Sequence, residues 1–177
     1  MSAIDVDQTQ GECLVYAFKE GLLSAVAHDL KIRVTRWKLH CTEDRSNLHA
    51  SFDATSLRVV CVMRDGHPEL NAPSERDRQT IEKHLLEDVL QARRYPTIEL
   101  DAKVDVSLRL TGTLTLHGVA RPIITTIQQS ATHYVSNVTV NQIDYRIKPF
   151  SAMLGALKVK PHVHVALTVN LPFSLTR

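Results

Sequence analysis

The sequence predicts a mainly β fold: an extended antiparallel barrel of about eight strands with one inserted amphipathic α-helix. Apolar and polar residues alternate over most of the 177 residues, which is typical of strands that bury only one face. Helical spacing of apolar residues occurs in a single stretch, at about residues 74–94. One helix cannot cover a sheet of this size, so we expect the sheet to close on itself and remove its edges.

The strands are clearest at residues 108–116 and 163–171. In both segments leucines or valines occupy nearly every second position, and the residues between them are mostly polar. This pattern indicates an antiparallel sheet with one wet face, because strands of parallel sheets are apolar on both faces. Gly118 follows the first of these segments and favours a tight turn into the next strand. Weaker copies of the pattern start at Leu14, Leu30, Leu48 and Ile98.

The expected helix has recognisable ends. Ser74 and Asp77 are spaced as an N-terminal capping pair, and Pro96 ends the helical segment and starts the next strand. The apolar stripe must cover another apolar surface, and the open end or flank of the barrel is the available partner. This stripe consists of Ile81, Leu85, Leu86, Val89 and Leu90.

Composition limits the class of protein. We expect a flexible tail at residues 1–10 and a single β-barrel domain at residues 11–177. A hydrophobic fraction of 44% excludes wholesale disorder, and a net charge of +2 without a basic stripe argues against a nucleic-acid partner. No apolar run is long enough for a membrane span. The polar N-terminus lacks the features of a secretory signal, so the expected location is the cytoplasm.

Motifs of common enzymes do not occur in the sequence. It contains no glycine-rich phosphate loop, no G-x-S-x-G and no H-E-x-x-H, so we expect no cofactor, no catalytic residue and no metal site. His162 and His164 share one face of a strand, and we interpret them as residues of its wet face rather than as metal ligands. The alternative is a metal-assisted enzyme in which His28 and Asp29 converge with one of these histidines or with His117.

Four segments in sequence order resemble the YceI-like family. The residues Leu110-Thr-Gly-Thr-Leu-Thr-Leu-His-Gly-Val119, followed by Ala-Arg-Pro, are similar to the family's G-x-L-T hairpin, with Ala120 where threonine is usual. Residues 21–30 resemble its early histidine segment, and residues 85–100 resemble its helix that ends in Tyr-Pro. Residues 143–155 resemble the segment before its last strand.

This resemblance implies a lipocalin-like barrel that carries a long apolar ligand of the polyisoprenoid type. We therefore favour a carrier, without catalysis, for an isoprenoid or fatty-acid-like molecule held by apolar contacts inside the barrel. The candidate lining residues are Phe18, Leu30, Ile32, Phe52, Leu110, Leu114, Val165 and Leu167, with Phe150, Met153 and Leu154 as a lid. The candidate polar residues of the mouth are His28, Asp29 and His117.

A further alternative is a solid barrel that acts through its surface as a homodimer. Trp37, the only tryptophan, falls in alternation with Lys31, Arg33 and Thr35, which places it on the wet face of its strand. An exposed tryptophan suits a protein interface, where aromatic anchors concentrate binding energy. If the strand kinks before it, the same side chain instead caps the end of the barrel.

Overall fold

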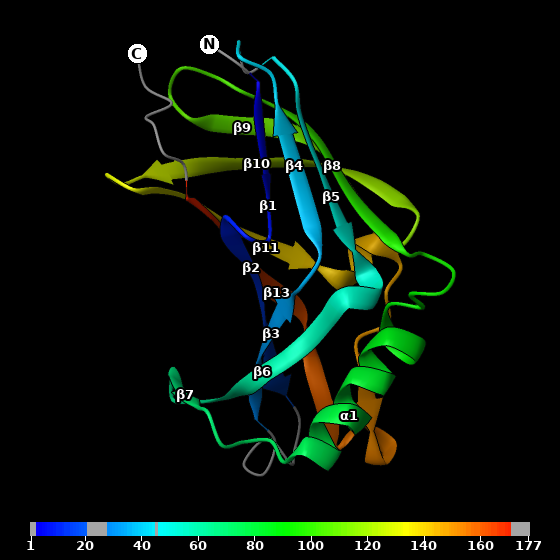
Figure 1. Cartoon of the computed structure of the whole chain (residues 1–177). Coiled ribbons are helices and arrows are strands. Elements are labelled where there is room, and N and C mark those ends of the chain that lie inside the picture. Colours follow the sequence, from blue (N-terminus) through cyan, green and yellow to red (C-terminus); the bar gives the residue numbers. More distant parts are fainter. Residues whose placement is uncertain (1–2, 21–27, 45, 171–177) are drawn as a thin grey trace.

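The computed structural model describes residues 3–20, 28–44 and 46–170, which form one curled antiparallel sheet of thirteen strands with a single α-helix beside it (Figure 1). The strands are β1 (Ile4–Asp7), β2 (Gly11–Glu20), β3 (Asp29–Val34), β4 (Trp37–Cys41), β5 (Leu48–Asp53), β6 (Leu57–Arg64), β7 (His67–Glu69), β8 (Thr97–Val104), β9 (Arg109–Leu116), β10 (Val119–Gln129), β11 (His133–Asn141), β12 (Ser151–Ala152) and β13 (Leu157–Asn170). The helical elements are α1 (Glu75–His84), the π-helical turn η2 (Leu85–Val89), and the 3₁₀ turns η1 (Ala54–Ser56), η3 (Gln142–Tyr145) and η4 (Met153–Gly155).

Two pairs of consecutive strands, each continuous across a bend, close the sheet into a barrel. β3 continues into β4 across residues 35–36, and β5 continues into β6 through η1. The amide of Thr35 donates to the Ser56 carbonyl at 3.1 Å, and the amide of Asp53 donates to the Arg36 carbonyl at 3.0 Å, so the two bent strands stay paired across the bend. β3 also pairs with β2 and β5 pairs with β8, which completes the ring.

Counted in this way, the barrel has eight long strands: β2, β3–β4, β5–β6, β8, β9, β10, β11 and β13. The expected antiparallel, mainly β barrel class is confirmed; the number of strands differs from the expectation, because the sheet has thirteen, of which the bent pairs count as one long strand each. The short strands β1, β7 and β12 are additions at its margins.

The ring has one loose seam, between β10 and β11. These strands pair only where Ile127–Gln129 face residues 134–136. Further along, side chains bridge the seam: the Thr125 hydroxyl donates to the Asn137 carbonyl at 2.9 Å, and the Arg121 Nε donates to the Asp144 carbonyl at 3.1 Å. The barrel is therefore splayed here, although it stays connected.

The expected N-terminal tail is partly ordered, so that expectation is corrected. Residues 4–7 form β1, which pairs with β4. Ile4 and Val6 are buried. Two apolar residues in alternation are too short a signal to predict a strand, but they contribute to the core once β4 supplies a partner edge.

The predicted helix is confirmed at its start and is shorter than expected at its end. The Ser74 hydroxyl accepts a hydrogen bond from the Asp77 amide at 3.2 Å, as an N-cap should. The helix then widens into η2, and the chain turns at Gln91, which has a positive φ of 47°. Helical geometry therefore ends several residues before Pro96.

The helix is tied to the edge of β6. The Glu82 carboxylate accepts from the Val59 amide at 2.8 Å, and Arg78 Nη1 donates to the Val59 carbonyl at 3.2 Å. These side chains satisfy backbone groups that a neighbouring strand would otherwise satisfy. As a result, α1 covers the flank of the barrel beside β6 (Figure 1).

Trp37 is buried, so its expected place on the wet face is wrong. Only 4% of its surface is exposed. The bend at residues 35–36 shifts the phase of the alternation, so Trp37 points inward like Val34 rather than outward like Arg33. Its ring lies 6.3 Å from that of Phe52. The kinked-strand alternative is the one observed, and it removes Trp37 as a candidate interface anchor.

One end of the barrel is filled by side chains. We call it the filled end and define it by buried residues that include Trp37 from β4, Leu110 from β9 and both buried residues of β1. Its members are Ile4, Val6, Trp37, Cys41, Leu48, Ala50, Val104 and Leu110.

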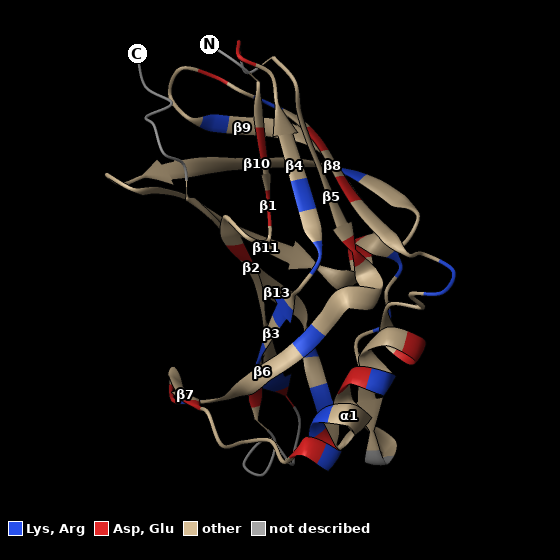
Figure 2. Cartoon of the chain, in the orientation of Figure 1, with Lys and Arg blue, Asp and Glu red and all other residues tan. Residues whose placement is uncertain are grey.

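The outer surface mixes charges of both signs. Figure 2 shows Lys and Arg residues interspersed with Asp and Glu residues on the strands and on α1, without a stripe of one sign in that view. No helix among the described residues is long and apolar enough to cross a membrane.

Candidate functional site

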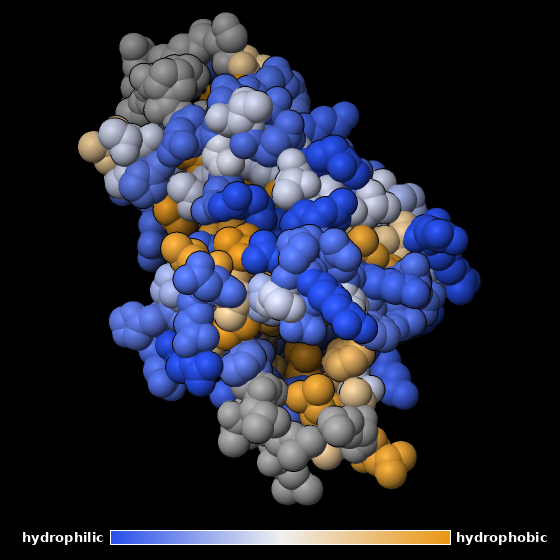
Figure 3. All heavy atoms as spheres, turned by 60° about the horizontal axis from the view of Figure 1, so that its bottom comes forward, coloured by the Kyte–Doolittle hydropathy of each residue, from blue (hydrophilic) through white to orange (hydrophobic). Residues whose placement is uncertain are grey.

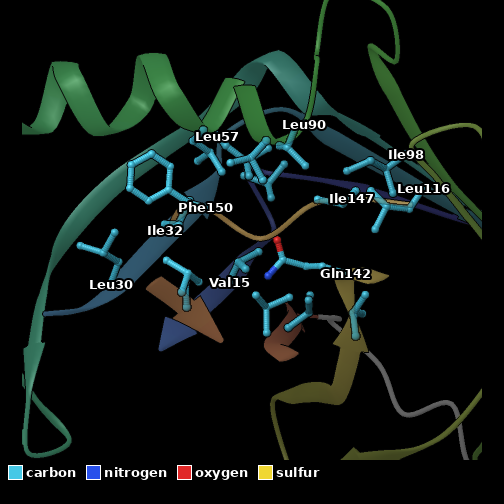
Figure 4. A pocket seen from close by; sticks show the side chains of 18 of the residues that line it. Val15, Leu30, Ile32, Leu57, Leu90, Ile98, Leu116, Gln142, Ile147 and Phe150 are labelled. Atoms are coloured by element: carbon cyan, nitrogen blue, oxygen red, sulfur yellow. The ribbon is translucent and has the colours of Figure 1, made fainter. Parts of the chain in front are cut away.

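The other end of the barrel is hollow. A cavity of about 500 Å³ lies between the inner faces of the strands and the helix (Figure 4). This volume falls in the usual range of ligand pockets. We call this region the hollow end. Its apolar wall includes Cys13, Val15, Ala17, Leu30, Ile32, Val34, Ile98, Leu100, Leu114, Leu116, Val163, Val165 and Leu167 from strands, and Ile81, Leu85, Val89 and Leu90 from the segment that contains α1 and η2.

The alternation of the strands places these side chains. Successive residues of a strand point to opposite faces, so Leu30 and Ile32 share the inner face of β3, and Val163 and Val165 share that of β13. The helix contributes a wall because its apolar stripe faces the same space. The interior therefore offers apolar contact from nearly every direction.

Polar and charged residues gather where the cavity opens. The exposed side chains of His28, Asp77, His84 and Lys158 reach the cavity, together with the partly exposed Lys19. Figure 3 turns this end of the molecule forward and shows apolar atoms at the surface among hydrophilic ones. The opening thus combines an apolar interior with a polar rim.

Inside the cavity one polar side chain is buried. Gln142, in η3, is 7% exposed and lines the cavity. Its Nε2 donates to the Lys160 carbonyl at 3.1 Å. Among the described residues, Ser56 is the other buried polar residue, and its hydroxyl is fully used at the β5–β6 bend.

The wall also contains a thiol. Cys13 is buried and faces the cavity. Burial raises the pKa of this thiol to about 12, and the negative charge of neighbouring Glu12 adds to the increase. At neutral pH the group is therefore a protonated, weakly polar part of the wall and not a nucleophile.

Many of the residues predicted from the sequence lie at this cavity. The predicted residues that line it are Leu30, Ile32, Phe52, Leu114, Phe150, Val165, Leu167 and His28. They come from distant parts of the chain, and the structure brings them together around one space.

Two predicted lining residues lie elsewhere. Phe18 is on the outer face of β2, where its ring meets that of His164 edge-on at 5.0 Å. Residues 13–18 are apolar on both faces, so periodicity does not distinguish the two, and the smaller residues Cys13 and Ala17 face inward. Leu110 has the expected inward direction, but it is packed into the filled end.

The expected lid is only partly present. Phe150 lies at the cavity, with its ring 5.5 Å from that of His84. Leu154 has a positive φ of 54° and is fully exposed, so it does not cover the opening. The side chain of Met153 lies outside the described part of the structure.

The predicted polar mouth is dispersed. His28 is at the rim, but the Asp29 carboxylate instead accepts from the Lys19 amide at 2.8 Å. His117 lies in the β9–β10 turn, where the centre of its ring is 4.2 Å from that of Tyr95 and the two rings are tilted by 49°. It is therefore a turn residue and not part of the mouth.

The structure places histidines of the enzyme alternative away from the cavity lining. That hypothesis pairs His28 and Asp29 with His117, His162 or His164. Of these three histidines, His117 lies in the β9–β10 turn, and His162 and His164 share the outer face of β13, opposite the cavity-lining Val163 and Val165. Within residues 3–20, 28–44 and 46–170, no group of three or more His, Cys, Asp or Glu residues is placed to hold a metal ion.

Two solved structures share this fold. One is a polyisoprenoid-binding domain from Saccharophagus degradans implicated in plant cell wall breakdown, which aligns with a TM-score of 0.61 and 14% identity over 97% of this chain and 99% of that one. The other is BcnA of Burkholderia cenocepacia, with a TM-score of 0.60 and 11% identity over 90% of this chain and 96% of that one. These likenesses establish a common architecture.

Sequence comparison identifies the family. No curated protein matches the chain. Residues 17–173 match the YceI-like domain, which includes all of the strands that form the cavity wall except the start of β2. The four segments of the resemblance, the closed eight-strand barrel and this match agree, and the chain belongs to the YceI-like family.

Proposed function

We propose that this protein binds and carries a long apolar molecule in the hollow end of its barrel, without changing it chemically. The observation that supports this most directly is the aliphatic cavity of about 500 Å³ with a polar rim. Burial of apolar ligand surface contributes roughly 25 cal/mol per Å². A wall of this kind therefore supplies affinity without requiring a charged partner inside.

The proposed ligand class is a polyisoprenoid or a similar branched aliphatic chain. Two features support it. The wall consists mainly of leucine, isoleucine and valine, with Phe52 and Phe150 as its aromatic members, and the similarly folded protein from Saccharophagus degradans is a polyisoprenoid-binding domain. Such a chain would enter past Lys19, His28 and Asp77 at the rim and place its apolar part against the strands and the helix.

The test is a binding titration with a fluorescent polyene alcohol as probe and geranylgeraniol as competitor. Val165→Phe adds a ring inside the cavity and should weaken binding at least tenfold. His164→Phe replaces the imidazole with a larger ring on the outer face of the same strand and should leave binding unchanged. Near-ultraviolet circular dichroism checks that both variants are folded.

Two outcomes would overturn the proposal. One is the absence of binding to the wild-type protein after lipid has been removed from it. The other is equal binding by both variants, which would place the ligand outside the cavity.

A further inference from the structure

The strongest unexplained feature of the cavity is the side-chain oxygen of Gln142. The side chain is more than nine-tenths buried, and it lies in a wall made almost entirely of hydrocarbon. Burying a polar group in such surroundings is unfavourable unless the group forms a hydrogen bond. The carboxamide has two ends, and the structure accounts for one of them.

The nitrogen end has a structural partner. The pairing of β13 with β2 shifts register between Val159 and Val163, and the carbonyl of Lys160 lies within this irregularity. Gln142 Nε2 donates to that carbonyl at 3.1 Å. This bond fixes the orientation of the amide, because only the nitrogen end can donate to a carbonyl oxygen.

The oxygen end is left as an acceptor that faces the cavity. Figure 4 shows the Gln142 side chain in the middle of the view, between Val15 and Ile147, with its oxygen directed toward the Leu90 side and its nitrogen directed away from it. Oε1 forms no hydrogen bond with the described residues, and it is not one of their fully buried unpaired atoms, so it borders accessible space. A structural role at the β13 irregularity explains the hydrogen bond of Nε2, but it does not explain why an unpaired oxygen, Oε1, faces the cavity.

We propose that Gln142 Oε1 accepts a hydrogen bond from the ligand, so that the protein selects long apolar molecules with a neutral donor group, a hydroxyl or a primary amide. This inference rests on the proposed function. An ionised carboxylate or phosphate presents only acceptors, so neither could satisfy Oε1. A pure hydrocarbon would displace water from the acceptor and leave it unpaired, which is the costly case.

The experiment compares three ligands with one common chain: geranylgeraniol, its methyl ether and the corresponding primary amide. The wild-type protein should bind the alcohol or the amide about tenfold more tightly than the ether, and the member of the pair that binds more tightly identifies the donor. In Gln142→Leu this preference should fall to within about twofold, while the affinity for the ether is retained.

Two matched variants keep the result interpretable. Gln142→Met keeps an unbranched side chain of similar length, and it should lose the preference in the same way. It replaces the leucine variant in the comparison if that variant folds poorly. Ser136→Ala removes the hydroxyl of another cavity residue, on β11, and should retain the preference.

The outcomes separate the two proposals. If none of the three ligands binds the wild-type protein, the proposed function fails. If all three bind equally, or if the preference survives in both Gln142 variants, the carrier function stands and the assignment of Gln142 is wrong. Loss of the preference in Ser136→Ala alone would also overturn it.

Discussion

The two ends of the barrel use the same strands and the same alternation, yet one is packed and the other is hollow. β9 shows this clearly: Leu110 and Leu114 point to the same side of the sheet, but Leu110 is buried in the filled end and Leu114 faces the cavity. The difference comes from what is added to the wall. The filled end receives Trp37 and the two buried residues of β1, whereas the hollow end is bordered by the helix and by residues 142–150, which leave the cavity open between them and the strands.

This comparison shows that an alternating strand pattern predicts which side chains face the barrel interior. It does not predict whether those side chains fill the interior or leave a cavity. A barrel of eight strands is wide enough either to be filled by side chains or to hold one small ligand. Here the choice depends on one large side chain and one short extra strand. Four predictions test this interpretation, and they follow in order of decreasing effect.

The largest effect should come from emptying the filled end. We expect Trp37→Ala to lower the free energy of unfolding by about 3–5 kcal/mol, because it leaves a void among packed side chains. The matched change at the hollow end is Leu100→Ala, which removes wall atoms that already border empty space, and it should cost about 1–2 kcal/mol. Urea unfolding measures both. Equal losses would show that the two ends are packed alike.

A second pair adds volume instead of removing it. Ala50 is fully buried in the filled end, and we expect Ala50→Leu to destabilise the protein by about 1–3 kcal/mol through overpacking. Ala17 faces the cavity, so Ala17→Leu has room for the larger side chain and should be close to neutral. Ligand affinity should show the reverse order, with a loss in Ala17→Leu only. A stability loss of similar size in both variants would contradict a hollow interior at Ala17.

A third prediction uses pH, through Cys13 in the cavity wall. Burial raises the pKa of this thiol from about 9 to about 12, so between these values the unfolded chain loses the proton first. The native state then holds more protons than the unfolded state, and stability must fall as pH rises above 9. Between pH 8 and pH 10, the free energy of unfolding measured in urea should fall by about 1 kcal/mol more for the wild-type protein than for Cys13→Ala. Parallel losses in the two proteins would mean that Cys13 does not titrate differently on unfolding.

The last prediction concerns the helix that borders the hollow end. Ser74→Ala removes the N-cap and should cost about 0.5–2 kcal/mol. Because the helix forms part of the cavity wall, ligand release followed by stopped flow should become faster. Thr80→Ala removes an exposed hydroxyl from the middle of the same helix and serves as the control. A stability loss without faster release would mean that the helix does not regulate access.

The sequence predicted the parts of the fold whose signal is local. The strands at residues 108–116 and 163–171 and the cap at Ser74 were recognised because alternation and capping are read from a few neighbouring residues. The same alternation predicts the inward direction of Leu30 and Ile32, which both border the cavity. Phe18 was misplaced because both faces of its strand are apolar, so the tertiary fit determines which face points inward.

Other features depend on contacts between distant segments. The bend before Trp37 contains neither glycine nor proline and is held by bonds to residues 53–56, so no local pattern marks it. Gln142 lies in the polar sequence Asn-Gln-Ile-Asp, which resembles an ordinary surface turn. Its importance appears only when β13 lies beside it, and the empty volume next to it depends on the packing of the whole barrel.

The pairing of β2 with β13 has a kinetic consequence. Gly11 lies opposite Val169 and Ala17 lies opposite Val163, so this ladder joins residues separated by most of the chain. The hairpins formed by β8, β9 and β10 need only short loops, whereas the β2–β13 ladder must first overcome a large loss of chain entropy. We therefore expect slow folding, with the early hairpins formed well before the ring closes. Both β2 and β13 supply walls of the cavity, so a molecule that binds there can associate only after the last and slowest closure.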